Sequence, residues 1–219
     1  MKLIIFDCDG VLVDSEALLV ELEMAFLEQH GLSFTIDSYI DQFMGIPVKD
    51  WISNTTALLV EKTGGPLSDD FFSPLESAIT RKLKEDLRPI EGALEAIKAL
   101  NCNKCVASSS SINSLNNKLT HTGLYDVFSP HIFSTQLVEK GKPSPDLFLH
   151  AASKLETSPG DCVVIEDSAN GVTAGKRAGM KVIGFTGGGH CPPGHGNSLL
   201  SSGADLIAKD FSDLVSLLS

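Results

Sequence analysis

Basic residues and long apolar runs are scarce in this 219-residue chain. It has 17 lysines and arginines against 28 acidic residues, a net charge of −11. So acidic a chain is a poor partner for nucleic acid or for an anionic membrane surface, and we expect neither. No run approaches the ~18 apolar residues of a membrane helix. The first apolar run stops at Asp7 and is too short for a signal peptide, so we expect a cytoplasmic protein. We also expect a monomer or weak dimer.

Cysteines are few and have no framework spacing. There are five, an odd number: Cys8, Cys102, Cys105, Cys162 and Cys191. Cys102 and Cys105 form a C-x-x-C pair, but no second C-x-x-C or C-x-x-H accompanies it, so a zinc site at that pair is not expected. Cysteines inside apolar runs are instead expected to act as small core residues.

The most informative segment is Leu3–Ser15, LIIFDCDGVLVDS. Its apolar run predicts a buried strand that ends at Asp7 and Asp9, and a glycine then permits a sharp turn. Ligands of an open α/β sheet gather beyond the carboxyl ends of strands, and two crowded carboxylates need a cation or a shared proton. A calcium loop is the alternative, but it would require oxygen ligands where the chain has Val11 and Leu18.

A second strand is predicted to end in a run of serines, within Lys104–Ser111. Ser108, with Ser109 beside it, can bind a phosphoryl oxygen together with backbone N–H groups of the turn. Ser110 or Ser111 can instead be the N-cap of the next helix. Both interpretations can hold for neighbouring serines.

A lysine before a predicted helix is the third candidate. Lys142 lies in KGKPSPD, where prolines stiffen the approach to a helix expected over 146–154. A compact cation on rigid backbone suits a contact to a phosphoryl group and to a nucleophilic carboxylate.

The fourth candidate is a pair of acids, Glu166 and Asp167, at the end of an apolar run. Alone, the pair is typical of a helix start, where negative charge is favourable. Together with Asp7 and Asp9 it supplies carboxylate ligands for a hard divalent cation, and Mg²⁺ is expected because it prefers a few carboxylates plus waters and a substrate phosphate.

The spacing of the four segments predicts an inserted domain. A βα step takes about 30 residues, which fits the steps from Ser108 to Lys142 and from Lys142 to Asp167. The stretch between Asp7 and Ser108 is roughly 70 residues too long for one step. We therefore expect a core made of residues 1–14 and 88–219, and a helical domain of residues 15–87.

Apolar periodicity supports an α/β fold. The inserted domain should contain helices over 15–30, 36–43, 48–63 and 69–86. Strands are expected near residues 2–7, 103–107, 131–134, 162–166, 181–185 and 205–208. The predicted architecture is a three-layer, Rossmann-like, mostly parallel sheet with an inserted α-helical domain.

Taken in order, the four segments resemble the motifs of the haloacid dehalogenase superfamily. The first resembles especially the branch of β-phosphoglucomutase and the small sugar-phosphate phosphatases. The resemblance implies strand order 5-4-1-2-3, an α-helical cap at the inserted domain, Mg²⁺ as cofactor and a phosphate ester as substrate. It also separates the chain from true dehalogenases, which need no general acid at the position of Asp9.

The resemblance further implies a role for each motif residue. Asp7 attacks the phosphoryl group, and Ser108 and Lys142 hold that group. Asp9 protonates the leaving alcohol and then deprotonates water, for which its pKa should be raised toward neutrality. The metal ligands would be Asp7, the backbone carbonyl of Asp9, Asp167 and, as ligand or neighbour, Glu166.

Departures from the mutase pattern favour a phosphatase. In the mutases a histidine follows the first motif and cations flank a glycine of the cap, whereas here Leu19 takes the histidine position and Met44 and Val48 flank Gly45. We predict hydrolysis of a small phosphate monoester through an aspartyl-phosphate, with Gly45 and Lys49 as substrate contacts. A sugar phosphomutase is the alternative.

A second alternative is a phosphoryl-accepting receiver module for signalling. It also combines acids, a hydroxyl residue and a lysine on a parallel sheet, but it needs no inserted domain. Turnover of a phosphate ester with Mg²⁺ would exclude it.

The loop 187–196 is unusual in composition, with five glycines and two prolines together with His190, Cys191 and His195. Such side chains can bind a transition metal. We favour a surface loop shaped by its glycines and prolines, with at most a gating or substrate-edge role.

Overall fold

The computed structural model describes residues 1–43, 46 and 48–218. Contacts divide the chain into two compact units. The core unit comprises Met1–Glu16 and Leu87–Ser219, and the helical unit comprises Ala17–Asp86.

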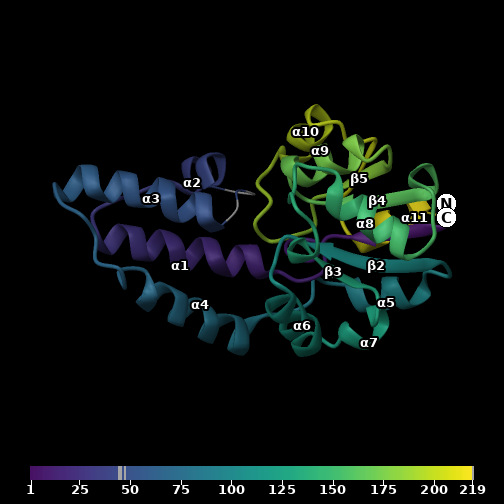
Figure 1. Ribbon diagram of the computed structural model, residues 1–219, viewed down its shortest axis with the longest axis horizontal. Coiled ribbons are helices and arrows are strands. Elements are labelled where there is room, and N and C mark those ends of the chain that lie inside the picture. Colours follow the sequence, from purple (N-terminus) through teal and green to yellow (C-terminus); the bar gives the residue numbers. More distant parts are fainter. Residues whose placement is uncertain (44–45, 47, 219) are drawn as a thin grey trace. The chain divides into compact units, whose positions relative to one another are not determined.

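The core unit is built on a six-stranded parallel sheet with the order β3-β2-β1-β4-β5-β6 (Figure 1). The strands are β1 Leu3–Phe6, β2 Asn103–Ser108, β3 Ile132–Ser134, β4 Cys162–Glu166, β5 Lys181–Phe185 and β6 Leu206–Ala208. The expected order is confirmed, with β6 added beside β5. In the register, Phe6 lies opposite Val106 on one side and Ile165 on the other, so β1, β2 and β4 end at the same edge.

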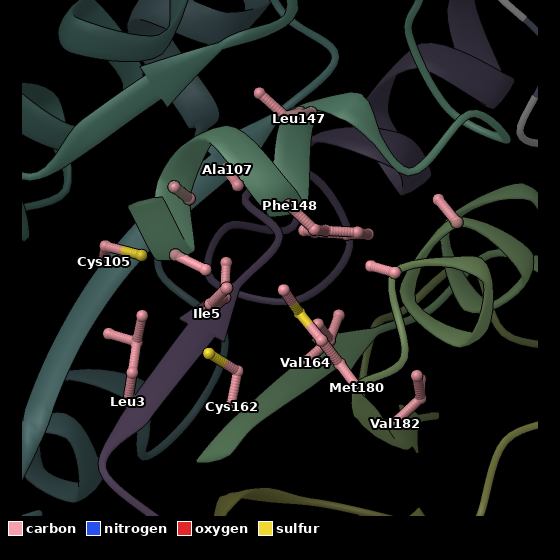
Figure 2. Packing of buried hydrophobic residues seen from close by; sticks show 14 of the residues in the cluster. Leu3, Ile5, Cys105, Ala107, Leu147, Phe148, Cys162, Val164, Met180 and Val182 are labelled. Atoms are coloured by element: carbon pink, nitrogen blue, oxygen red, sulfur yellow. The ribbon is translucent and has the colours of Figure 1, made fainter. Parts of the chain in front are cut away.

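Strand β1 is buried on both faces, which explains its uninterrupted apolar run. On one face, Leu3 and Ile5 pack in a cluster with residues of α8 and α9, such as Phe148 and Val172 (Figure 2). On the other face, the ring of Phe6 meets that of Phe128 in α7, with centroids 5.8 Å apart.

The helices of the core unit cover both faces of this sheet. They are α5 Ala93–Ala99, α6 Ile112–His121, α7 Tyr125–Phe128, α8 Asp146–Lys154, α9 Ala169–Arg177, α10 His195–Ser201 and α11 Phe211–Leu218. Helix α6 begins four residues after the end of β2, and α9 begins three residues after the end of β4, and both strand ends carry candidate site residues. Short 3₁₀ turns occur at Thr135–Leu137 and Pro159–Asp161.

The chain leaves and re-enters the core unit at one place. The N–H of Asp14 donates to the carbonyl of Arg88 at 3.1 Å, and the N–H of Ile90 donates to the carbonyl of Leu12 at 3.0 Å. Val13 and Pro89 form an antiparallel bridge between these two bonds. The two chain segments at the junction are therefore tied to each other by backbone hydrogen bonds.

The helical unit is made of four helices around its own apolar core. They are α1 Ser15–Gln29, whose residues from Ala17 onward belong to this unit, α2 Ile36–Phe43, α3 Val48–Thr63 and α4 Ser73–Asp86. Aromatic side chains of α2 and α3, such as Phe43 and Trp51, are buried in this core. Helix α4 begins later than the predicted residue 69, because residues 68–73 form turns in which Phe71 and Ser73 donate to carbonyls three residues earlier.

A buried hydrogen-bonded relay crosses the core of the helical unit. The indole N–H of Trp51 donates to the hydroxyl of Tyr39 at 2.8 Å, and that hydroxyl donates to the carboxylate of Glu23.

Among the described residues, no helix combines the length and the apolar character required to cross a lipid bilayer.

Candidate functional site

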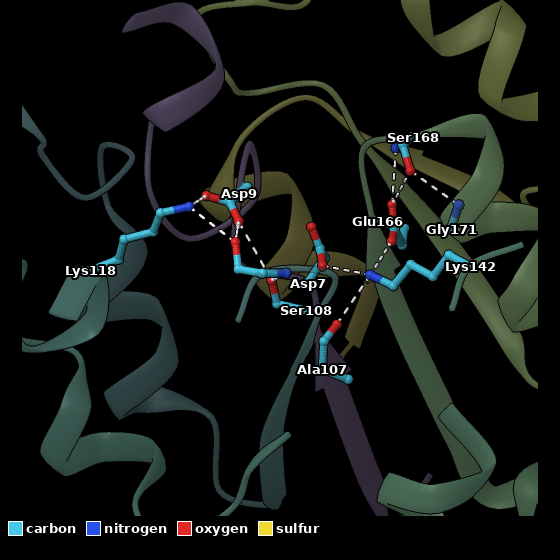
Figure 3. Close-up of polar contacts among 10 residues, drawn as sticks. Asp7, Asp9, Ala107, Ser108, Lys118, Lys142, Glu166, Ser168 and Gly171 are labelled. Atoms are coloured by element: carbon cyan, nitrogen blue, oxygen red, sulfur yellow. Dashed lines mark hydrogen bonds and ion pairs between the residues drawn. The ribbon is translucent and has the colours of Figure 1, made fainter. Parts of the chain in front are cut away.

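The candidate site lies where three central strands end. Asp7 follows β1, Ser108 ends β2 and Glu166 ends β4, and all three side chains are buried. Because the strands are parallel and in register, residues far apart in sequence meet at this edge (Figure 3).

Lys142 joins two of these strand ends. Its ammonium lies 2.5 Å from Oδ1 of Asp7 and 2.7 Å from Oε1 of Glu166, and it donates to the carbonyl of Ala107 at 3.1 Å. The side chain is 5% exposed, with its ammonium 5.0 Å from the centre of the Phe148 ring. The predicted contact between this lysine and the candidate nucleophile Asp7 is present in the structure.

Glu166 is fixed by the start of helix α9. Its Oε2 accepts hydrogen bonds from the N–H and the hydroxyl of Ser168 at 3.0 and 2.9 Å. The same Ser168 hydroxyl caps the helix by accepting from the N–H of Gly171 at 3.0 Å. A Cβ on Gly171 would lie 1.7 Å from Oε1 of Glu166, so only glycine leaves room for this carboxylate.

Three carboxylates gather at the strand ends, those of Asp7, Glu166 and Asp167, each with an oxygen within 4.8 Å of the others. Gly10 has φ +77°, and a Cβ there would lie 2.0 Å from Oδ2 of Asp167, so a glycine is required at this turn. No described residue donates a hydrogen bond to Oδ2 of Asp7 or to Oδ1 of Asp167. Hard oxygen donors with free positions suit a cation such as Mg²⁺.

Burial and charge shift the pKa values in this cluster. The pKa of Asp7 lies well above its ordinary value, because burial and the neighbouring acids outweigh the attraction of Lys142. The pKa of Lys142 is also raised: burial alone would lower it, but the carboxylates of Asp7 and Glu166 prevail. The neighbouring acids thus raise the pKa of Asp7, and a bound cation would relieve this crowding of negative charge.

The carboxylate of Asp9 lies outside the three-carboxylate cluster and accepts hydrogen bonds from other residues. Oδ1 accepts from the hydroxyl of Ser15 at 2.5 Å and from the ammonium of Lys118, and Oδ2 accepts from the hydroxyls of Ser110 at 2.8 Å and Ser108 at 3.4 Å. Figure 3 shows Lys118 and Lys142 on opposite sides of the two aspartates.

The expectation of a raised pKa for Asp9 is wrong for this arrangement. Burial would raise the pKa, but the charge of Lys118 and the hydrogen bonds from Lys118, Ser15 and Ser110 lower it below its ordinary value. The neighbouring Glu16 shows the opposite shift. Its pKa is raised to about 7, by burial and by the charges of Asp9 and Asp167.

Lys118 was not predicted as a site residue. It lies on α6, and its side chain is only 9% exposed. Ser111 is the N-cap of this helix, and its hydroxyl accepts from the N–H of Ser114 at 3.3 Å. Its neighbours on the buried face are Leu115 and Leu119. The sequence does contain a signal for this residue: a lysine on the apolar face of an amphipathic helix predicts a buried charge that is paired with an acid.

His190 was expected on a surface loop, and it is buried instead. Its Nε2 lies 2.9 Å from Oδ2 of Asp167, and the side chain is 1% exposed. Burial would lower its pKa, yet the hydrogen bonds and charges of Asp167 and Cys191 raise it to about 11. Each acid at the strand ends thus has a cationic partner, and His190 is the partner of Asp167.

The remaining predicted site residues are peripheral or undescribed. Ser109 is exposed after the end of β2, and Lys49 is exposed on α3 in the helical unit. Gly45 lies outside the described residues.

Comparison with known proteins agrees with this architecture. Residues 4–185 match the family of haloacid dehalogenase-like hydrolases. A bifunctional riboflavin kinase/FMN phosphatase of Arabidopsis thaliana is 35% identical over 82% of this chain, which spans 47% of that relative. A phosphorylated carbohydrates phosphatase of Thermotoga maritima is 31% identical over 84% of each chain.

Among solved structures, a haloacid dehalogenase-like protein of unknown function from Agrobacterium tumefaciens superposes with a TM-score of 0.89. It is 35% identical, and the match covers 100% of this chain and 97% of that one. On its sequence and on its fold, the chain belongs to the haloacid dehalogenase-like hydrolases.

Proposed function

We propose that this protein is a magnesium-dependent phosphatase that hydrolyses a small phosphate monoester, such as a sugar phosphate, in the cytoplasm. The observation that carries the proposal is the position of Lys142, between the carboxylates of Asp7 and Glu166 and beside the open oxygens of Asp7 and Asp167. An ammonium so placed can hold a phosphoryl oxygen close to the nucleophile.

The proposed metal ligands are Asp7, Asp167 and the backbone carbonyl of Asp9, with Glu166 beside them. Glu166 already accepts hydrogen bonds from Lys142 and Ser168, so its proposed role is chiefly to hold these two residues in place rather than to bind the metal directly. When bound, Mg²⁺ supplies positive charge that reduces repulsion between the anionic nucleophile and the anionic ester.

Asp7 is the proposed nucleophile. Its oxygen forms a bond to phosphorus while the bond from phosphorus to the substrate oxygen breaks, and the alcohol leaves. Lys142 fixes Asp7 for this attack, and Ser108 stands at the neighbouring strand end to receive a phosphoryl oxygen.

Asp9 is the proposed acid and base. It gives a proton to the leaving oxygen, and afterwards takes one from the water that attacks the aspartyl-phosphate. Its lowered pKa favours the second of these steps, in which a carboxylate must accept the proton. The helical unit is the proposed determinant of substrate choice, with Ser109 and, on α3, Lys49 as further contacts to the anionic substrate.

The test is a phosphate-release screen over sugar phosphates, phosphoglycolate and nucleotides with Mg²⁺. We expect turnover by the wild type and a loss of at least about 1,000-fold in Asp7→Asn, roughly 4 kcal/mol of barrier, with unchanged circular dichroism. Asp7→Asn retaining more than about a tenth of the wild-type rate would overturn the nucleophile assignment.

The products separate a phosphatase from the alternative sugar phosphomutase. The enzyme is incubated with β-glucose 1-phosphate, Mg²⁺ and a trace of glucose 1,6-bisphosphate. Because Leu19 and Val48 replace polar side chains of the mutases, water should intercept the aspartyl-phosphate and release free phosphate. Rapid formation of glucose 6-phosphate with little free phosphate would instead identify a mutase.

A further inference from the structure

The loop after β5 brings three soft or borderline metal ligands together beside the candidate site. His190, Cys191 and His195 each offer a ligand atom, and these atoms lie within 4.8 Å of one another. Imidazole and thiolate are preferred by Zn²⁺ and similar transition metals, whereas Mg²⁺ prefers oxygen. The ligand set thus differs in chemistry from the adjoining carboxylates.

The distances suit one metal ion. The Sγ of Cys191 lies 3.4 Å from Nε2 of His190, near the separation of two ligands that bind one tetrahedral zinc at about 2.3 Å and 2.0 Å. Oδ2 of Asp167 lies 2.9 Å from the same Nε2 and is available as a fourth ligand. Four ligands complete a tetrahedral site.

The His190 ring is held by packing. A Cβ on Gly10 would lie 2.6 Å from its Cε1, and a Cβ on Gly188 would lie 2.7 Å from its Nδ1, so both glycines make room for the imidazole. This Nδ1 is buried and has no hydrogen-bond partner among the described residues. The ring's polar contacts are therefore made through Nε2, the atom that faces Cys191 and Asp167 and would bind the metal.

The other two ligands are accessible. Cys191 and His195 are half-buried, so an ion can reach the cluster from solvent. The Nε2 of His195 lies 2.6 Å from the carbonyl of Asp167, to which it can donate. Histidine ligands in metal sites commonly donate their second N–H to a carbonyl in this way, which orients the ring.

We propose that His190, Cys191 and His195 form a second metal site, selective for Zn²⁺ or a similar borderline cation, with the carboxylate of Asp167 as fourth ligand. Binding displaces the protons of the Cys191 thiol and of His190, which pass to solvent. Because Asp167 then serves the second metal, the site inhibits catalysis. Inhibition rests on the proposed phosphatase function, whereas metal binding does not.

Co²⁺ added to metal-free protein tests the site directly. A thiolate-to-cobalt charge-transfer band should develop and saturate at one equivalent, and excess Zn²⁺ should remove it. Cys191→Ser should abolish the band. Cys102→Ser is the matched control, because Cys102 is also a half-buried free cysteine, and it should leave the band intact. A wild type without the band, or a band that survives in Cys191→Ser, overturns the proposal.

Calorimetric titration with Zn²⁺ measures the affinity. We expect Kd to rise at least about 10-fold in Cys191→Ser and in His195→Gln and to stay unchanged in Cys102→Ser. Equal Kd values in the wild type and both ligand variants contradict the site.

The same Zn²⁺ concentrations are then applied to the phosphatase assay. Zn²⁺ should lower the wild-type rate and should affect Cys191→Ser far less, each relative to its own zinc-free rate. If the protein binds zinc but releases no phosphate from any ester, the proposed metal site is supported and the proposed phosphatase function is refuted. Zinc binding through Cys191 without inhibition of an active enzyme would refute the shared Asp167.

Discussion

The ammonium of Lys118 is hydrogen-bonded to the carboxylate of Asp9, although 109 residues separate them in the chain. The pair joins the middle of α6 to the turn after β1. Two other basic residues pair with acids at the strand ends: Lys142 lies between Asp7 and Glu166, and His190 lies against Asp167.

The Lys118–Asp9 pair should set the pH dependence of turnover. In Lys118→Met the burial of Asp9 is no longer offset by a cation, so the pKa of Asp9 rises. A base must be deprotonated, and the acidic limb of kcat should therefore move to higher pH, with roughly a 10-fold loss near pH 6, about 1.4 kcal/mol. Rates from pH 5 to 9 check this. Lys104→Met is the control, since Lys104 donates to carbonyls of Ile97 and Leu100; identical shifts in both variants would contradict the assignment.

Gly171→Ala should destabilise the protein. Alanine is favoured over glycine in a helix by about 1 kcal/mol, but the new Cβ would lie 1.7 Å from Oε1 of Glu166 and displace that carboxylate. We expect a net loss of about 1–3 kcal/mol in the free energy of unfolding, measured with denaturant. Gly160→Ala, where a Cβ meets nothing within 4 Å, should stay within about 0.5 kcal/mol of the wild type. A stabilised Gly171→Ala would show that Glu166 moves freely.

Activity should depend on Mg²⁺ through Asp167. Excess chelator should abolish turnover, and Asp167→Ala should raise the Mg²⁺ concentration for half-maximal rate at least about 10-fold, because one charged ligand is lost. The control is Asp161→Ala, an acid paired with Lys2 at the protein surface, which should leave the Mg²⁺ requirement unchanged. Full activity in excess chelator would show that the enzyme does not need Mg²⁺ and would contradict this part of the proposed function.

Glu23 should make stability depend on pH. Its pKa is raised to about 7 because burial outweighs the hydrogen bond from Tyr39, so the folded state holds a proton more tightly than the unfolded chain does. Stability is therefore lost as pH rises from about 4.5 to about 7, and the loss is complete above that. Glu23→Gln, which keeps an acceptor for Tyr39, should be more stable than the wild type by about 1–2 kcal/mol at pH 8 and by little at pH 4.

Thermal unfolding at the two pH values measures the Glu23 effect. Glu28→Gln on the exposed face of α1 is the control and should show no such difference between pH 4 and pH 8. A Glu23→Gln gain of equal size at both pH values would mean that charge plays no part in it.

Strand ends were predictable because their signals are local. An apolar run followed by Asp7 or by Glu166 marks both a strand and its terminus, and parallel pairing brings such termini together. The basic partners of these acids could not be predicted in the same way, because a pairing such as Lys118 with Asp9 depends on how α6 lies against the sheet. His190 lies in a loop without periodicity, so no pattern marked it as buried. The lowered pKa of Asp9 followed from the same unpredicted partner.

The backbone bonds that join Asp14 to Arg88 and Leu12 to Ile90 have a consequence for folding. They close residues 17–86 into a loop whose ends are already fixed by the core. The entropy of closing a loop grows only with the logarithm of its length, so an unfolded insert costs the sheet little. We therefore expect the two units to open separately, so that amide hydrogen exchange in the helical unit proceeds by its own opening while the sheet stays protected. An insert connected in this way can be exchanged for a different sequence with the central strands left intact.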